Sequence, residues 1–207
     1  ASNAFCVVRP PGHHAGPRGV VTCSNDPCGS HGFCLLNNVA IGAGYAKAAG
    51  NYGAAFYPTS LALSKGFDQI VWTDSSNHQK IEEVGTMSVV FRINDKLITP
   101  RTSDTILDGV TRKSVIQVAD DIGIKVEERD ITVTEVISEF KSGNLKEIFG
   151  CGTAAVIAPI NSFGYKDERF QLKELDDNFA SKIKTAIINI QQNISDDTHN
   201  WRYRITE

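Results

Sequence analysis

Short apolar runs alternate with amphipathic helical segments through most of the chain, and this pattern limits the folds that it can adopt. Residues 109–122, for example, place apolar side chains three to four positions apart and are followed by Gly123, as in a helix and its C-terminal end. The predicted helices are 54–64, 109–122, 133–141 and 179–190, and the predicted strands are 69–73, 86–93, 97–99, 124–128 and 154–159. The alternation predicts a mixed α/β protein with one compact core.

Length and composition are those of a globular protein. The chain has 207 residues, of which 41% are hydrophobic and 22% are charged, so it can bury a core without disulfide or metal support. Its net charge of −3 argues against binding to nucleic acid or to anionic membranes through bulk charge. The sequence shows no apolar run long enough to span a membrane and no signal peptide at its start. We therefore expect a soluble, intracellular protein.

The first part of the chain differs in composition from the rest. Four of the five cysteines and three of the five histidines precede residue 35, among closely spaced prolines and glycines. Such a segment is typical of loops, with a predicted strand at 5–8 and a predicted helix at 36–46. The cysteines are irregularly spaced and do not form the framework of a secreted, disulfide-rich domain. We expect a compositional boundary at 42–47.

Four short segments carry residue types that suit pyridoxal phosphate. Lys47 precedes small residues, a setting in which a partly desolvated amine becomes nucleophilic. Glu83 stands before a Gly-Thr bend, and residues 105–112 lead from a loop into a helix, whose first N–H groups favour a bound phosphate. Thr153 lies in a second turn that contains glycine. Each of these residues alone is more often an ordinary structural residue, and only their combination predicts the cofactor.

These segments also carry a family resemblance. The strings AKAAGNYG, IEEVGTM, ILDGVTR and FGCGTAA, in this order from about Gly44 onward, resemble the large domain of branched-chain amino acid aminotransferases, which are fold-type IV pyridoxal-phosphate enzymes. The resemblance implies that residues 47–207 form a class IV, cofactor-binding large domain. Its fold would be D-amino acid aminotransferase-like, a pseudo-barrel of strands with surrounding helices. The implied reaction is transamination of leucine, isoleucine or valine with 2-oxoglutarate, using pyridoxal 5'-phosphate, and the resemblance allows a homodimer.

The resemblance also implies a role for each matching residue. Lys47 would form the Schiff base with the cofactor and move the proton at the substrate Cα, Glu83 would pair with the ring nitrogen, and Tyr52 would lie near the phenolic oxygen. Three further groups would hold the phosphate, namely the backbone N–H groups of Val110 and Thr111 and the hydroxyl of Thr153. Three small residues would lie beside the cofactor and the substrate: Thr86, Ala154 and Ala155. Ser88 departs from the family, in which many relatives carry asparagine at this position.

A second resemblance covers residues 1–46. CVVRPPGHHA at 6–15 and GFCLLNNVA at 32–40 resemble the active-site loop and the following helix start of histone deacetylases. In that family the tandem histidines, here His13 and His14, act as general base and acid beside a zinc-bound water. The metal-binding Asp-x-Asp-x-His-His block of the family is absent from this sequence. We therefore do not expect the fragment to be an independent domain, to bind a metal ion or to deacetylate a substrate.

Several alternatives stay open. Cys23, Cys28, His31 and Cys34 could bind zinc, but their spacings are not those of the usual close pairs, and reduced, inert thiols are the other interpretation. The chain looks like a fusion in which the deacetylase fragment replaces the small domain of the aminotransferase, and we expect transamination to be impaired because that small domain is missing. It could also be a zinc-dependent deacetylase-like protein or a non-catalytic remnant of the aminotransferase fold.

Overall fold

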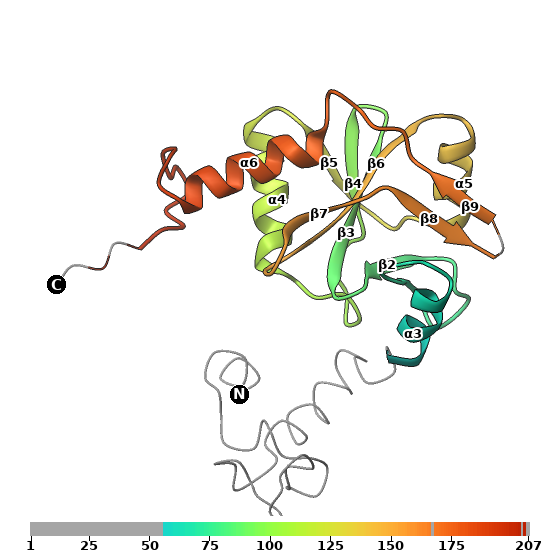
Figure 1. Ribbon diagram of the computed structural model, residues 1–207. Coiled ribbons are helices and arrows are strands. Elements are labelled where there is room, and N and C mark those ends of the chain that lie inside the picture. The colour runs from blue at the N-terminus through green and yellow to red at the C-terminus, as the bar shows by residue number, and fades with distance from the viewer. Residues whose placement is uncertain (1–55, 167, 204, 206–207) are drawn as a thin grey trace, which may run out of the picture. The chain divides into compact units, whose positions relative to one another are not determined.

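The structure is a computed structural model that describes residues 56–166, 168–203 and 205 (Figure 1). The strand predicted at 5–8, the helix predicted at 36–46 and the boundary predicted at 42–47 lie outside the described residues. Helix α3, Phe56–Ser64, agrees with the helix predicted over 54–64. The compact unit that carries the rest of the fold begins at Lys65. Within the described residues, none of the helices has the length and apolarity needed to span a membrane.

One sheet forms the centre of this unit. Its strands in the described part of the chain are β1 (Val71–Thr73), β2 (Ile81–Val84), β3 (Met87–Ile93), β4 (Lys96–Thr99), β5 (Lys125–Glu128), β6 (Leu145–Gly152) and β7 (Val156–Ile160). Strand β3 lies in the middle, because it pairs antiparallel with β2 and β4 along one edge and with β6 along the other. Strand β1 extends the sheet beyond β2, and β7 extends it beyond β6. Strand β5 pairs parallel with β4, and helix α4 (Val110–Asp121) makes the crossover that a parallel pair requires.

Two tight turns fix the register around β3. Gly85, the first of the two residues between β2 and β3, has a φ of +57°, and a Cβ atom on it would come within 2.2 Å of Gln69 Oε1. Asn94, the first residue of the turn between β3 and β4, has a φ of +53°, which asparagine tolerates better than most residues. As a result of the first turn, Glu83 lies opposite Ser88.

Two layers cover the two faces of the sheet (Figure 1). On one face lie helices α4 and α6 (Phe179–Gln191), and on the other lie helix α5 (Val133–Lys141) and the hairpin of β8 (Ser162–Tyr165) and β9 (Glu168–Gln171). Because side chains alternate across a strand, Val90 of β3 contributes to the first core and its neighbours Val89 and Phe91 contribute to the second. The sheet is therefore buried on both faces around β3.

A buried ion pair joins the sheet to the start of α6. Arg92 Nη1 lies 2.7 Å from Glu147 Oε1, and the two side chains are 8% and 6% exposed. The Glu147 carboxylate also accepts hydrogen bonds from the N–H groups of Phe179 and Ala180, at 2.9 and 3.0 Å. The guanidinium of Arg92 lies over the Phe179 ring, 3.5 Å from its centroid. These contacts satisfy first-turn N–H groups that have no partner inside the helix.

The predicted mixed α/β class is confirmed, and α4, α5 and α6 agree with the predicted helices. Some boundaries differ. The turn after β3 lies at 94–95 rather than at 95–96, and the strand predicted at 154–159 begins at Val156, because residues 153–155 form the turn after β6. Strands β2, β6, β8 and β9 were not predicted. Charged side chains interrupt the apolar pattern of β2 and β6, which removes the signal on which strand prediction depends.

Candidate functional site

Glu83 lies on β2, one residue pair before the turn to β3, and its side chain is half-buried. The N–H group of Leu107 donates a hydrogen bond to Glu83 Oε1 at 3.4 Å. Burial raises the pKa of the Glu83 carboxyl above its ordinary value, and the hydrogen bond from Leu107 opposes this shift without cancelling it. A cationic group placed against Glu83 would favour the ionised carboxylate and would be held by it.

Glu83 is one end of a row of side chains that crosses the sheet. Strand pairing aligns Glu83 with Ser88, Ser88 with Cys151 and Cys151 with Ile157, so these side chains share one face. The start of α4 lies against this row, because a Cβ atom on Gly109 would stand 3.9 Å from Ser88 Oγ. Burial raises the pKa of the Cys151 thiol to about 12, so this thiol is not a nucleophile. The polar end of the row is therefore the end at Glu83 and Ser88.

Helix α4 begins without a side-chain cap. Its N-cap residue is Gly109, which has no side chain that could accept a hydrogen bond. The N–H groups of Val110 and Thr111 donate to no acceptor among the described residues. Helix N-termini carry partial positive charge, and open N–H groups there bind phosphate and other anions. The side chain of Val110 is 80% exposed, so a ligand can reach this candidate anion site.

The turn between β6 and β7 lies at the same end of the sheet. Strand β6 runs antiparallel to β3, so its last residues stand opposite Ser88 at the beginning of β3. The turn contains Thr153 and Ala154, which are exposed, and Ala155, which is half-buried. Val156 follows with a φ of +57°, a left-handed conformation that costs a β-branched residue about 1–3 kcal/mol. Strain of this kind clusters at ligand sites, so the turn is a second candidate for ligand contact.

The structure brings most of the predicted site residues to one end of the sheet. These residues are Glu83, Thr86, Val110, Thr111, Thr153, Ala154 and Ala155. The other predicted residues lie outside the described part of the chain, namely Lys47 and Tyr52, the histidines His13 and His14, and the zinc alternative Cys23, Cys28, His31 and Cys34. Within the described residues, no group of three or more His, Cys, Asp or Glu side chains is arranged to hold a metal ion.

Arg112 also supports this end of the sheet, although no role was predicted for it. Its side chain is 3% exposed and donates hydrogen bonds to the Pro100 carbonyl at 2.8 Å and to Glu128 Oε2 at 2.7 Å. These bonds tie the first turn of α4 to the end of β4 and to β5. The sequence does contain a signal for this role. Arg112 precedes Val115 by three residues and Ala119 by seven, a spacing that places it on the face of α4 that packs into the core.

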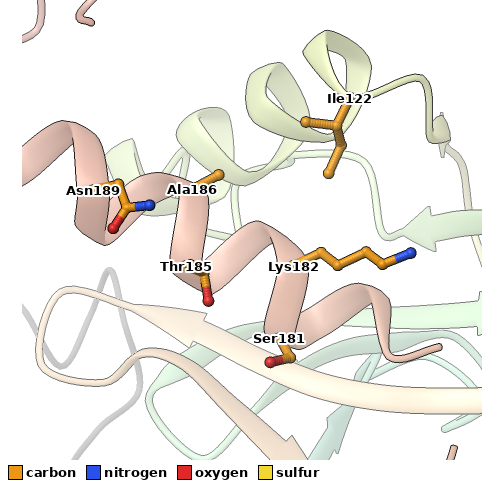
Figure 2. A pocket seen from close by; sticks show the side chains of 6 residues that line it. All are labelled: Ile122, Ser181, Lys182, Thr185, Ala186 and Asn189. Atoms are coloured by element: carbon orange, nitrogen blue, oxygen red, sulfur yellow. The ribbon is translucent and has the colours of Figure 1, made fainter. Parts of the chain in front are cut away.

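A groove on the outer side of α6 lies away from this end of the sheet (Figure 2). It has a volume of about 480 Å³ and is lined by Ile122, Ser181, Lys182, Thr185, Ala186 and Asn189. Ile122 follows the last residue of α4, so the 12-residue helix, about 18 Å long, separates the groove from the open N–H groups. None of the predicted site residues lines the groove, and it is not part of the candidate site.

Two family models match the chain. The model of amino-transferase class IV matches residues 41–163, which is more than half of the chain. The model of the histone deacetylase domain matches residues 1–57, so the two matches overlap from residue 41 to residue 57. The second match covers only a minor part of the chain and does not show that the chain belongs to that family.

Individual relatives show the same relationship. The chain is 38% identical over 165 residues to the probable branched-chain-amino-acid aminotransferase of Staphylococcus epidermidis, which covers 79% of this chain and 46% of that protein. It is 40% identical over 161 residues to branched-chain-amino-acid aminotransferase 2 of Bacillus subtilis, covering 77% and 44%. A crystal structure of the branched-chain amino acid aminotransferase from Thermobaculum terrenum in its PLP form matches with a TM-score of 0.55 and 27% identity, covering 66% and 41%. The chain thus spans somewhat less than half the length of the curated relatives that it matches.

The class IV match includes every described residue of the candidate site, from Glu83 to Ala155. The family resemblance predicted from about Gly44 onward is therefore confirmed. The chain belongs to the amino-transferase class IV family.

Proposed function

We propose that this chain binds pyridoxal 5'-phosphate and transfers the amino group of leucine, isoleucine or valine to 2-oxoglutarate. The observation that carries the proposal is a half-buried carboxylate, Glu83, bonded to the loop that leads into the open helix start at Val110 and Thr111. The names of the curated relatives and the PLP form of the T. terrenum enzyme support this cofactor and this reaction.

The described residues fit this cofactor at two points. Pyridoxal phosphate has a basic nitrogen in its pyridine ring and a phosphate on a substituent of that ring. The Glu83 carboxylate suits the protonated nitrogen, and the N–H groups of Val110 and Thr111 suit the phosphate. Thr153 adds an exposed hydroxyl in the turn after β6, and Thr86 lies in the turn that follows β2. When bound, the cofactor supplies an electron sink for the negative charge that develops at the substrate Cα.

Glu83 is suited to keep a ring nitrogen protonated. In the free chain, burial raises the pKa of its carboxyl, so the ionised form is poorly stabilised. A protonated nitrogen beside it would favour the carboxylate, and the carboxylate would in turn hold the proton on the nitrogen. The N–H group of Leu107 fixes Glu83 Oε1, whereas Oε2 has no hydrogen-bond partner among the described residues and is available to the nitrogen.

Further roles are proposed from the family motifs. Lys47 would supply the amine that bonds to the cofactor and would move the proton at the substrate Cα, and Tyr52 would lie near the phenolic oxygen. Ala154 and Ala155 carry small side chains, which leave room for a branched aliphatic substrate.

Association of two copies is also part of the proposal. The apolar side chains of Leu107 and Val110, at the open end of the sheet, are 67% and 80% exposed. Exposed apolar side chains that lie together favour contact with another surface. Sedimentation of the purified chain should show a dimer that Val110→Lys weakens, and a monomer at all concentrations would contradict this part.

Absorbance and calorimetry on the purified chain test the main proposal. We expect saturable binding of pyridoxal phosphate with a visible absorption band that the free cofactor lacks, and only slow formation of glutamate from leucine and 2-oxoglutarate in a coupled assay. Lys47→Ala should remove the band, whereas Lys173→Ala, at an exposed lysine outside the motifs, should keep it. A chain that binds no pyridoxal phosphate, or a band that survives Lys47→Ala, would contradict the proposal.

A further inference from the structure

The loop between β4 and α4, residues 100–109, is held to the sheet by a second glutamate. Thr105 Oγ1 donates a hydrogen bond to Glu82 Oε1 at 2.8 Å. The Ser103 hydroxyl lies 3.1 Å from Thr105 Oγ1 and accepts a hydrogen bond from the Thr105 N–H group at 3.3 Å. The side chain of Ile106, the next residue, is buried. Glu82 therefore contacts the loop at a point where polar and apolar contacts both restrain it.

Consecutive glutamates of β2 hold this one loop. Thr105 donates to Glu82, and the N–H group of Leu107 donates to Glu83. The pairing of β2 with β1 is irregular at this point, because Ile81 pairs with Thr73 and Glu83 pairs with Trp72, so Glu82 is left without a partner on β1. A shift of the loop along β2 would break at least one of these contacts, and together they fix its position.

The same segment sets the position of the α4 start. The N–H group of Gly109 donates to the Leu107 carbonyl at 2.9 Å, and the open N–H groups of Val110 and Thr111 follow directly. A displacement of Thr105 would therefore move the open N–H groups relative to Glu83.

We propose that Glu82 and Thr105 position this loop so that Glu83 and the N–H groups of Val110 and Thr111 face one bound pyridoxal phosphate. The inference rests on the proposed function, because it takes pyridoxal phosphate as the ligand. Glu82 is a positioning residue, since it acts through Thr105 and does not itself touch the cofactor.

Glu82 affects Glu83 in two separable ways. Its carboxylate accepts the hydrogen bond from Thr105, and its negative charge adds to burial in raising the pKa of Glu83. Thr105→Val removes the hydrogen bond and keeps the charge. Glu82→Gln keeps an acceptor oxygen and removes the charge, which lowers the pKa of Glu83. The pH below which the chain loses its affinity for the cofactor should therefore be lower in this variant.

The test combines amide hydrogen exchange of the free chain with titration of pyridoxal phosphate. Thr105→Val should raise the exchange of residues 103–109 and weaken binding about fivefold, as expected for the loss of one net hydrogen bond of about 1 kcal/mol. Glu82→Gln should leave the exchange of these residues as in wild type and shift the pH profile of binding. Thr134→Val is the matched control, because Thr134 Oγ1 also donates to a side chain in an exposed position, Gln79 Oε1 at 3.3 Å.

Faster exchange together with weaker binding in Thr105→Val, and neither change in Thr134→Val, would support the inference. If the exchange rate is unchanged in Thr105→Val, the claim that Thr105 restrains the loop is wrong. If exchange is faster but the affinity for pyridoxal phosphate is unchanged, the claim that the restrained loop aids cofactor binding is wrong. An unshifted pH profile in Glu82→Gln would overturn the charge effect. A wild-type chain that binds no pyridoxal phosphate would instead overturn the proposed function, and exchange alone would then decide whether Glu82 and Thr105 order the loop.

Discussion

Each end of strand β3 brings a glutamate of a neighbouring strand close to the start of a helix, but the two ends differ. At one end, Glu147 of β6 accepts hydrogen bonds from the N–H groups of Phe179 and Ala180 at the start of α6. At the other end, Glu83 of β2 accepts its hydrogen bond from the loop residue Leu107, and α4 begins with open N–H groups. One helix start is thus closed by the protein itself, and the other is left for a ligand.

The two glutamates also differ in whether a basic side chain neutralises them. Glu147 is paired with the buried Arg92 at 2.7 Å. Glu83 has no basic side chain within ion-pair distance in the part of the chain that the structure describes, and burial raises its pKa. A carboxylate that is partly buried without a cationic partner costs stability, so the open end of the sheet carries a cost that the closed end avoids. A cationic ring nitrogen beside Glu83 would remove this cost.

The largest expected effect comes from breaking the closed end. Glu147→Gln should lower the free energy of unfolding by about 3 kcal/mol, because it removes the buried carboxylate beside Arg92 and leaves this guanidinium only the exposed carboxylates of Asp177 and Asp95, 3.6 and 3.9 Å away. Urea unfolding followed by circular dichroism measures the change. Asp130→Asn is the matched control: the Lys80–Asp130 pair has the same 2.7 Å separation but is exposed, so its loss should cost less than about 1 kcal/mol. Equal losses in the two variants would show that burial does not distinguish the pairs.

Proline at the first position of each helix sharpens the comparison. Val110→Pro should leave the free chain about as stable as wild type, since proline suits the first helical position and the Val110 N–H group has no acceptor among the described residues. It should nevertheless weaken pyridoxal phosphate binding roughly tenfold or more, because a charge-assisted hydrogen bond of about 1.5–3 kcal/mol is lost. Calorimetric titration measures the affinity.

At the closed end the same substitution should act on stability instead. Phe179→Pro should destabilise the chain by about 1.5–3 kcal/mol beyond Phe179→Ala, because the Phe179 N–H group donates to Glu147. The alanine variant accounts for the lost aromatic packing. A Val110→Pro chain that binds the cofactor like wild type would exclude the Val110 N–H group as a phosphate ligand.

The smallest effect is expected from Glu83→Gln in the free chain. A carboxyl whose pKa is raised by folding destabilises the fold once the pH exceeds that pKa, and has no effect at low pH, where it is protonated in both states. Glu83→Gln should therefore stabilise the free chain slightly at neutral pH, and this gain should vanish below the ordinary pKa of glutamate. Urea unfolding at several pH values measures it, and a loss of stability at neutral pH would contradict the assignment. Binding of pyridoxal phosphate should become weaker in this variant.

The helices could be predicted because their signals are local, whereas two central features of the sheet could not. Strand β6 is interrupted by Glu147, which is tolerated there because Arg92, 55 residues earlier, neutralises it and the first N–H groups of α6 donate to it. Gly150 also weakens the strand signal, since glycine disfavours strand interiors. A Cβ atom on Gly150 would lie 2.7 Å from Met87 Cε and 3.2 Å from Val84 Cγ1, so a larger residue would require these side chains of β3 and β2 to shift. Both requirements come from other strands and are not visible in the local pattern.

Part of the candidate site could likewise be predicted from the sequence, and part could not. Glu83, Val110 and Thr153 belong to short strings whose order carries the family resemblance, and the strand register then brings them to one end of the sheet. The hydrogen bond between Thr105 and Glu82 joins residues 23 positions apart. It depends on the irregular pairing of β2 at Glu82 and on the position of the loop, which a residue pattern does not encode.

If the start of α4 holds the phosphate of the cofactor and the start of α6 is closed, the two helix starts must respond differently to pyridoxal phosphate. Titration of isotope-labelled chain, followed through its backbone amide resonances, measures this response directly. We predict that the resonances of Val110 and Thr111 shift during the titration and that those of Phe179 and Ala180 stay unchanged, because the latter N–H groups already donate to Glu147. Unchanged resonances at Val110 and Thr111, or equal shifts at the two helix starts, would contradict an open site at α4.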